Sequence, residues 1–142
     1  MKISARNQFK GRATVLHIGK INADVSVDIG GGDRITASIT SKSLEYLGIR
    51  DGVDVYALVK ASSVMVMAAG TPLRLSARNQ LRGIVVKCQK GTVNSEVAIQ
   101  LAGGETMTAI ITNESMDALE LSEGTEAIAV FKSTGVILGV TL

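Results

Sequence analysis

The sequence predicts an all-β protein made of two tandem five-stranded β-barrels, each with one short helix. Two observations predict this fold class: the chain repeats itself, and each copy alternates short apolar runs with tight glycine turns. The composition agrees, with 15 glycines and 46% hydrophobic but only 3% aromatic residues. The apolar content therefore lies mainly in Val, Ile, Leu, Ala and Met, and β-branched residues favour pleated strands.

The repeat is the strongest signal in the chain. The run SARNQ at Ser4–Gln8 returns at Ser76–Gln80, so that the offset is 72 residues. The same offset, without gaps, pairs Lys60 with Lys132 and also pairs the double glycines and the ITxxS motifs of the two halves. A register held over such a length indicates a duplicated structural unit.

The repeat divides the chain into domain 1, residues 1–69, and domain 2, residues 73–142. The boundary carries Pro72, the only proline. A unit of about 70 residues buries a thin core and often needs a partner. We therefore expect the halves to pair with each other, the chain to oligomerise, or both.

Within the first half the local pattern predicts five strands and one helix. Alternating Val25, Val27 and Ile29 have the period of a half-buried strand. The segment Gly30–Asp33 predicts a hairpin turn. The expected strands are residues 7–18, 24–29, 34–39, 53–60 and 64–67, and the order of elements predicts an OB-type barrel.

The helix is expected at residues 41–47, with Thr40 as its N-cap and Gly48 just past its end. The second half repeats this arrangement, but Glu120 replaces Gly48 and weakens the stop signal there.

Charge and composition exclude several classes of function. The net charge of +2 is too even to predict nucleic-acid or membrane binding, and no apolar run is long enough to span a membrane. One cysteine and one histidine, Cys88 and His17, leave no disulfide, no metal cluster and no catalytic triad. We interpret both as ordinary strand residues, and we expect no enzyme activity, no cofactor and a cytoplasmic location.

Three short segments shared by both halves could hold an anion, because all of them offer hydrogen-bond donors. In the first half they are the Ser4–Arg6 segment, the hydroxyls of Thr40 and Ser43 at the helix start, and Lys60 at a strand end. Each has a plainer interpretation. Thr40 fits a helix cap and Lys60 a solvated side chain, Arg6 and Arg78 fit a carboxylate partner equally well, and Asn7 and Asn79 fit turns.

These motifs resemble a known family. SARNQxxG, GGxxxTAxITxxS and a lysine followed by small turn residues, each present twice and in order, are similar to the Mop domain of molbindins. The resemblance covers nearly all of both halves and identifies the chain as a two-domain (di-Mop) molbindin. It implies OB-fold Mop domains that bind molybdate or tungstate for intracellular storage and homeostasis, in a homotrimer with sites between domains and subunits.

By motif, the resemblance also implies the site residues. A possible second oxyanion site would use Asn22, Ala23, Asn94 and Ser95. Ala61 and Ser133 differ between the copies, so the pockets could differ in affinity. The main site would use Ser4, Ala5, Arg6, Thr40, Ser43, Lys60 and Ala61 and, in the second copy, Ser76, Ala77, Arg78, Thr112, Ser115, Lys132 and Ser133.

Two other functions stay open from sequence. A regulatory module could pass oxyanion occupancy to a partner protein. An OB-fold could also bind single-stranded nucleic acid, although two Tyr, two Phe and no Trp give a poor stacking surface.

Overall fold

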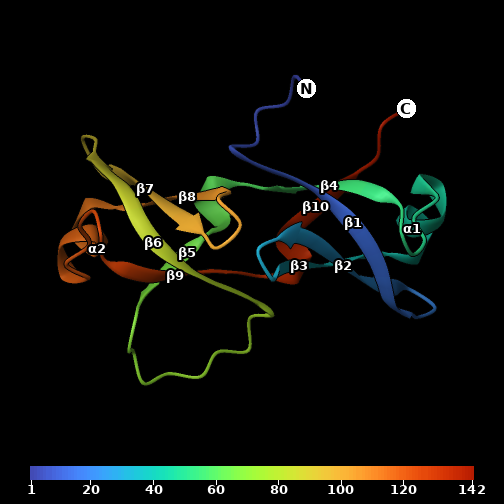
Figure 1. Ribbon diagram of the computed structural model, residues 1–142, viewed down its shortest axis with the longest axis horizontal. Helices are drawn as coiled ribbons and strands as arrows, with labels where there is room; N and C mark the ends of the chain where they lie inside the picture. The colour runs from blue at the N-terminus through green and yellow to red at the C-terminus, as the bar shows by residue number, and fades with distance from the viewer.

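The structure, a computed structural model, describes residues 1–142 and has two lobes with one short helix at each end (Figure 1). The first half contains β1 (Asn7–Ile18), β2 (Asn22–Gly30), β3 (Asp33–Thr40), α1 (Ser41–Leu47), β4 (Asp54–Val59), the 3-10 turn η1 (Ala61–Ser63) and β5 (Met65–Ala68). The second half contains β6 (Asn79–Lys90), β7 (Asn94–Leu101), β8 (Thr106–Thr112), α2 (Asn113–Ala118), β9 (Glu126–Phe131), η2 (Ser133–Gly135) and β10 (Val136–Gly139).

The predicted fold class is confirmed: the chain forms two curled five-stranded sheets with two short helices. The predicted bounds of β1 and α1 agree with the structure, and the other strands of the first half differ by one or two residues at their ends. Thr40 caps α1, as predicted, by accepting a hydrogen bond from the Ser43 amide at 3.0 Å. Neither helix has the length and apolar character that a membrane-spanning helix needs.

The two halves exchange their last strands. The sheets have the orders β10-β4-β1-β2-β3 and β5-β9-β6-β7-β8. Val136 of the second half pairs with Val59, and Met65 of the first half pairs with Val130. Each sheet therefore takes four strands from one half and the fifth from the other. The division at residues 1–69 and 73–142 describes the repeat, and it stays a prediction as a division into folding units.

Each sheet curls until its edge strands approach each other, β10 near β3 and β5 near β8. The apolar side chains of β2 that alternate along the strand, Val25 and Val27 among them, are fully buried in the resulting core. In β9, which lies between β5 and β6, all five residues of Ala127–Phe131 are buried. Both faces of β9 are thus covered.

The hairpin tips of the two halves touch. A Cβ atom added at Gly31 would lie 2.2 Å from the Gly103 backbone nitrogen, closer than any real contact. Gly31 also has a positive φ of 66°. Glycine is required here both for the turn and for the close approach of the second lobe.

The weakened stop signal in the second half has a visible consequence. Gly48 ends α1 in the left-handed conformation, with a φ of 65°. The equivalent Glu120 has a φ of 53° and is the one residue other than glycine with positive φ. The helix therefore still ends, but a glutamate holds a conformation that glycine holds more easily.

Candidate functional site

Two related pockets contain most of the predicted donor residues. The Lys60 pocket has a volume of about 400 Å³ and is lined by Ile3, Ser4, Ala5, Arg6, Leu58, Lys60, Ala61, Ser62, Ile110 and Ile137. The Lys132 pocket has a volume of about 370 Å³ and is lined by Met65, Leu75, Ser76, Ala77, Arg78, Val130, Lys132, Ser133 and Thr134. The structure therefore brings the SAR segment and the lysine of each repeat together, from opposite ends of that half.

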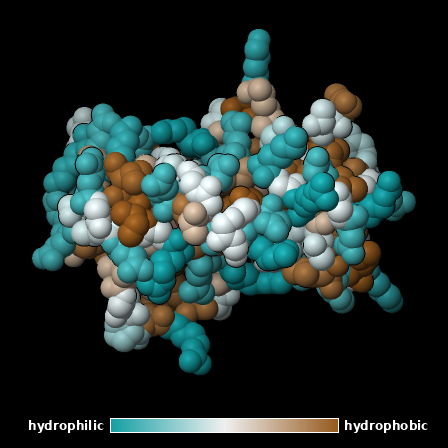
Figure 2. Space-filling view, in the orientation of Figure 1, coloured by the Kyte–Doolittle hydropathy of each residue, from teal (hydrophilic) through white to brown (hydrophobic).

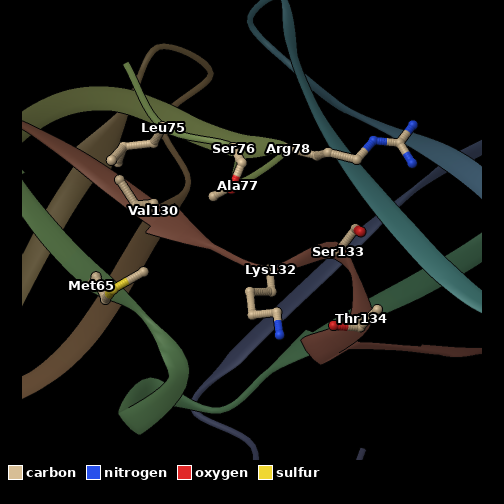
Figure 3. Close-up of a pocket in the computed structure, with 9 residues that line it drawn as sticks. All are labelled: Met65, Leu75, Ser76, Ala77, Arg78, Val130, Lys132, Ser133 and Thr134. Atoms are coloured by element: carbon tan, nitrogen blue, oxygen red, sulfur yellow. The ribbon is translucent and has the colours of Figure 1, made fainter. Parts of the chain in front are cut away.

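The topology explains this juxtaposition. The SAR segments lead into β1 and β6, whose first residues pair with the last residues of β4 and β9. Lys60 and Lys132 follow these strands directly and precede the turns η1 and η2. In the Lys132 pocket, Ser76 and Ala77 lie across the cavity from Ser133, while the Arg78 side chain extends away from Lys132 (Figure 3).

Both lysines are free cations. Neither Lys60 nor Lys132 forms an ion pair with a carboxylate, whereas seven other basic residues do. No aspartate or glutamate lines either pocket. An unpaired ammonium in a pocket without carboxylates attracts an anion, because nothing nearby neutralises it.

The two arginines just before β1 and β6 pair with carboxylates of the other half. Arg78 donates to Asp24 at 3.0 Å, and Arg6 contacts Glu96. The sequence left two roles open for these arginines, binding the anion or pairing with a neighbouring carboxylate. In the structure their side chains pair with carboxylates. Hydrogen bonds from Ser38 and Arg78 lower the pKa of Asp24, so that this carboxylate is ionised at neutral pH.

Glu96 occupies the equivalent position in the second half. Its carboxylate lies 2.6 Å from the ammonium of Lys87 as well as against Arg6. These two partners, Lys87 first, lower the pKa of Glu96.

The asparagines of the SARNQ motifs do not form turns, and the sequence interpretation of them was wrong. Asn7 and Asn79 are each 1% exposed. The Asn7 side chain donates to the Thr108 carbonyl and accepts from the Thr108 amide, both at 2.8 Å, and Asn79 does the same with Thr36. Each asparagine thus satisfies both backbone groups of one residue in the opposite sheet.

The hydroxyls at the helix starts lie apart from the two pockets. Thr40 and Ser43 line a neighbouring depression with Asn22, and Thr40 donates to the Ser43 hydroxyl at 2.8 Å. Thr112 and Ser115 form the same pair at 2.9 Å. The capping interpretation of both threonines is confirmed. Within one chain, however, these hydroxyls do not join the SAR segments and lysines.

The possible second site is divided between surface and interior. Asn22 and Asn94 are exposed, but Ala23 and Ser95 are each 1% exposed. The Ser95 hydroxyl donates to the Asn113 side chain and so is already bonded within the fold.

The remaining reactive residues do not cluster. His17 lies in β1 and Cys88 in β6, which belong to different sheets. Burial, with a smaller contribution from Glu123, raises the pKa of the Cys88 thiol and keeps it protonated. No group of three or more His, Cys, Asp or Glu residues is placed to hold a metal ion.

Sequence reasoning missed Ser38 and the partners of the two arginines. Ser38 donates to Asp24 at 2.8 Å, and its hydroxyl lies 2.9 Å from that of Ser133. The repeat could have indicated the arginine partners, because Asp24 and Glu96 are equivalent acidic residues and Arg6 and Arg78 are equivalent basic residues, but Ser38 has no counterpart, since its equivalent is Ile110.

Comparison with known proteins places this geometry in a family. The family model described as TOBE domain matches residues 3–66 and again residues 75–138. The chain is 43% identical, over 138 residues, to the molybdenum-pterin-binding protein MopA of Rhodobacter capsulatus, a match that covers 97% of this chain and 52% of MopA. It is 44% identical to the molybdenum transport protein ModE of Azotobacter vinelandii, covering 99% of this chain and 52% of ModE. The chain thus spans about half the length of these curated relatives.

A solved structure matches over the whole length. The cytoplasmic molybdate-binding protein ModG, solved with molybdate bound, superposes with a TM-score of 0.95 at 45% identity. The match covers 99% of this chain and 100% of the ModG chain.

Proposed function

Since this chain belongs to the TOBE-domain family, we propose that it binds molybdate, a tetrahedral divalent oxyanion, and holds it for storage and homeostasis inside the cell. One observation carries this proposal: each half presents an unpaired lysine and a Ser-Ala-Arg segment in a pocket that no carboxylate lines. Tungstate has the same charge and tetrahedral shape, and we include it as a ligand. The cytoplasmic location of ModG supports the same location for this chain.

The chemistry of the pockets suits an anion that must lose its hydration. Backbone amides and a hydroxyl of the Ser4–Arg6 segment, together with the Lys60 ammonium, replace water molecules as donors to the oxygens. Charge-assisted hydrogen bonds of this kind are roughly twice as strong as neutral ones. The carboxylates of Asp24 and Glu96 do not line the pockets, and each is held in an ion pair with an arginine.

We further propose that the pockets are completed in an oligomer, the homotrimer that the resemblance to molbindins implies. Both pockets are open, and the exposed apolar side chains of Met65 and Ile137 lie beside them. Apolar patches also interrupt the hydrophilic surface on both lobes in Figure 2. A neighbouring subunit would cover these side chains, exclude water, and bring its Thr40–Ser43 or Thr112–Ser115 hydroxyls to the bound anion.

A second candidate is a sensing module that passes oxyanion occupancy to a partner. The observation that favours it is the match to only half the length of MopA and ModE, because these relatives combine a half similar to this chain with a further part. In neither role does the chain act as an enzyme or need a cofactor, and both roles require the same pockets.

Equilibrium dialysis of the full chain against molybdate, tungstate, sulfate and phosphate tests the proposed function. We expect tight uptake of molybdate and tungstate, and a loss of uptake in the double variant Lys60→Ala, Lys132→Ala. The double variant Lys10→Ala, Lys90→Ala is the matched control, since neither side chain lines the two pockets. Failure of the wild-type chain to take up molybdate would overturn the proposal. A pull-down of partner proteins with and without molybdate separates storage from sensing.

A further inference from the structure

The two pockets are equivalent in the repeat but differ in their polar surroundings. In the Lys132 pocket, the Ser133 hydroxyl lies 2.9 Å from that of Ser38, which donates to Asp24 at 2.8 Å. Asp24 in turn pairs with Arg78, whose backbone lines the same pocket. A series of polar contacts therefore runs from the pocket wall at Ser133 to the partly buried Asp24 of the other half.

Counting the hydroxyl protons fixes the donor in each hydrogen bond between Ser133, Ser38 and Asp24. A serine hydroxyl has one proton, and that of Ser38 goes to the carboxylate of Asp24. The hydrogen bond between the two hydroxyls must then use the proton of Ser133. With that proton committed, the Ser133 oxygen offers only lone pairs to a ligand, which repel the oxygens of a fully deprotonated anion.

The Lys60 pocket has no such series of contacts. Ile110 stands at the position equivalent to Ser38, and Ala61 at the position equivalent to Ser133, and both line the pocket. The two positions therefore change together from a polar pair to an apolar pair. An apolar wall leaves the donors of the Lys60 pocket without a competing acceptor.

The charges differ as well. Glu96, which corresponds to Asp24, is held by Lys87 at 2.6 Å in addition to Arg6. The position equivalent to Lys87 in the first half is Val15, so the surroundings of the Lys60 pocket carry one more positive charge. His17 pairs with Asp24 across the strands, so the comparison of the two pockets is made at pH 8, where a histidine is ordinarily neutral.

We propose that the two pockets of one chain bind a divalent oxyanion with unequal affinity, the Lys60 pocket tightly and the Lys132 pocket weakly, and that Ser38, Ser133 and Lys87 set the difference. The inference rests on the proposed function. A positive charge about one Debye length from a dianion, in surroundings between protein and water, changes the affinity roughly tenfold, and we expect a difference of this order. Filling would then proceed in two stages, the Lys60 pocket first.

Titration calorimetry of the full chain with molybdate at pH 8, where histidine is ordinarily neutral, tests the proposal. We expect two classes of sites in equal number, with dissociation constants that differ roughly tenfold. Lys60→Ala should remove the tight class and Lys132→Ala the weak class. A single class of identical sites, or the reverse assignment, would overturn the inference, whereas complete absence of binding would instead remove the proposed function on which it rests.

Three further variants test the residues named. Lys87→Gln should weaken the tight class severalfold and leave the weak class unchanged, while Lys90→Gln, on the same strand but paired with Asp117, should change neither. The double variant Ser38→Ile, Ser133→Ala should strengthen the weak class toward the tight one. Because the Lys87 substitution is at the surface, it decides the question even if the double variant folds poorly. An equal effect of Lys87→Gln on both classes would contradict the assignment.

Discussion

Glu120 holds a backbone conformation that its side chain disfavours, and this predicts a stabilising substitution. The left-handed region costs a non-glycine residue roughly 1–2 kcal/mol, and glycine returns part of that through its larger entropy loss on folding. We expect Glu120→Gly to raise the free energy of unfolding by roughly 0.5–1 kcal/mol, measured by urea denaturation. Gly48→Ala at the equivalent position should lower it by about 1 kcal/mol. Equal stability of Glu120→Gly and the wild type would contradict the strain.

Asp24 predicts how stability depends on pH. Its pKa is lowered from 3.8 in the folded chain, chiefly by the Ser38 hydrogen bond and then by Arg78. A lowered pKa stabilises the fold above the unfolded value and loses that stabilisation as pH falls through the folded value. Asp24→Asn should therefore unfold more easily than the wild type at pH 7, and the difference should shrink below about pH 4. Melting temperatures of both proteins across this range provide the measurement.

The equivalent Glu96 provides the companion measurement. Its pKa is lowered from 4.5, chiefly by Lys87, so the destabilisation in Glu96→Gln should begin to shrink at a slightly higher pH than in Asp24→Asn. A difference that stayed constant from pH 7 to pH 3 in both variants would show that neither carboxylate acts through its charge.

For single residues, the sequence predicted the roles that depend on neighbouring residues or that recur in both halves. Thr40 as a cap and Lys60 as a free donor follow from their positions beside a helix and at a strand end. The partners of Arg6 and Arg78 could not be chosen, because a guanidinium recognises any nearby oxyanion and only the fold brings Glu96 and Asp24 within reach.

At the scale of elements, Asn7 and Asn79 link each sheet to a strand of the other. Removing the Asn7 side chain leaves the amide and carbonyl of Thr108 without partners in the interior. We expect Asn7→Ala to lower the free energy of unfolding by roughly 2–4 kcal/mol, since each unsatisfied buried group costs about 1–3 kcal/mol. Chemical denaturation followed by circular dichroism measures this loss.

The neighbouring Gln8 is the matched control. Its side chain bonds only to carbonyls of its own segment, those of Ile3 and Ala5. Gln8→Ala should therefore lower stability by no more than about 1 kcal/mol. A loss as large as that of Asn7→Ala would show that the link between sheets is not what Asn7 provides.

The strands and helices could be predicted because their signals are local. Alternation, the glycine turn before Asp33 and the cap at Thr40 act within a few residues, and the structure confirms them. The exchange of β5 and β10 could not be predicted. The two strands come from equivalent positions of a repeat, so the same sequence satisfies the pairing within a half and the pairing between halves.

At the scale of the whole molecule, the exchange predicts cooperative unfolding. Neither sheet can keep all five strands if the other half unfolds, and the hairpin tips at Gly31 and Gly103 add a further contact between lobes. We expect a single urea transition at the same midpoint by far-ultraviolet circular dichroism and by tyrosine fluorescence, which reports only on Tyr46 and Tyr56 in the first half. Two separated transitions would contradict this and would support independent folding of residues 1–69 and 73–142.

The pockets depend on the fold of the whole molecule, because each gathers a loop, a strand end and residues of both halves around one lysine. A crystal of the full chain grown with tungstate tests this most directly, since the heavy atom marks its own position. We predict anomalous density on the order of 4 Å from the donor atoms of the Ser4–Arg6 and Ser76–Arg78 segments, beside Lys60 and Lys132, because a tungsten–oxygen bond separates the metal from each oxygen that accepts a hydrogen bond. Tungstate bound only at other places, with both pockets filled by water, would contradict the account.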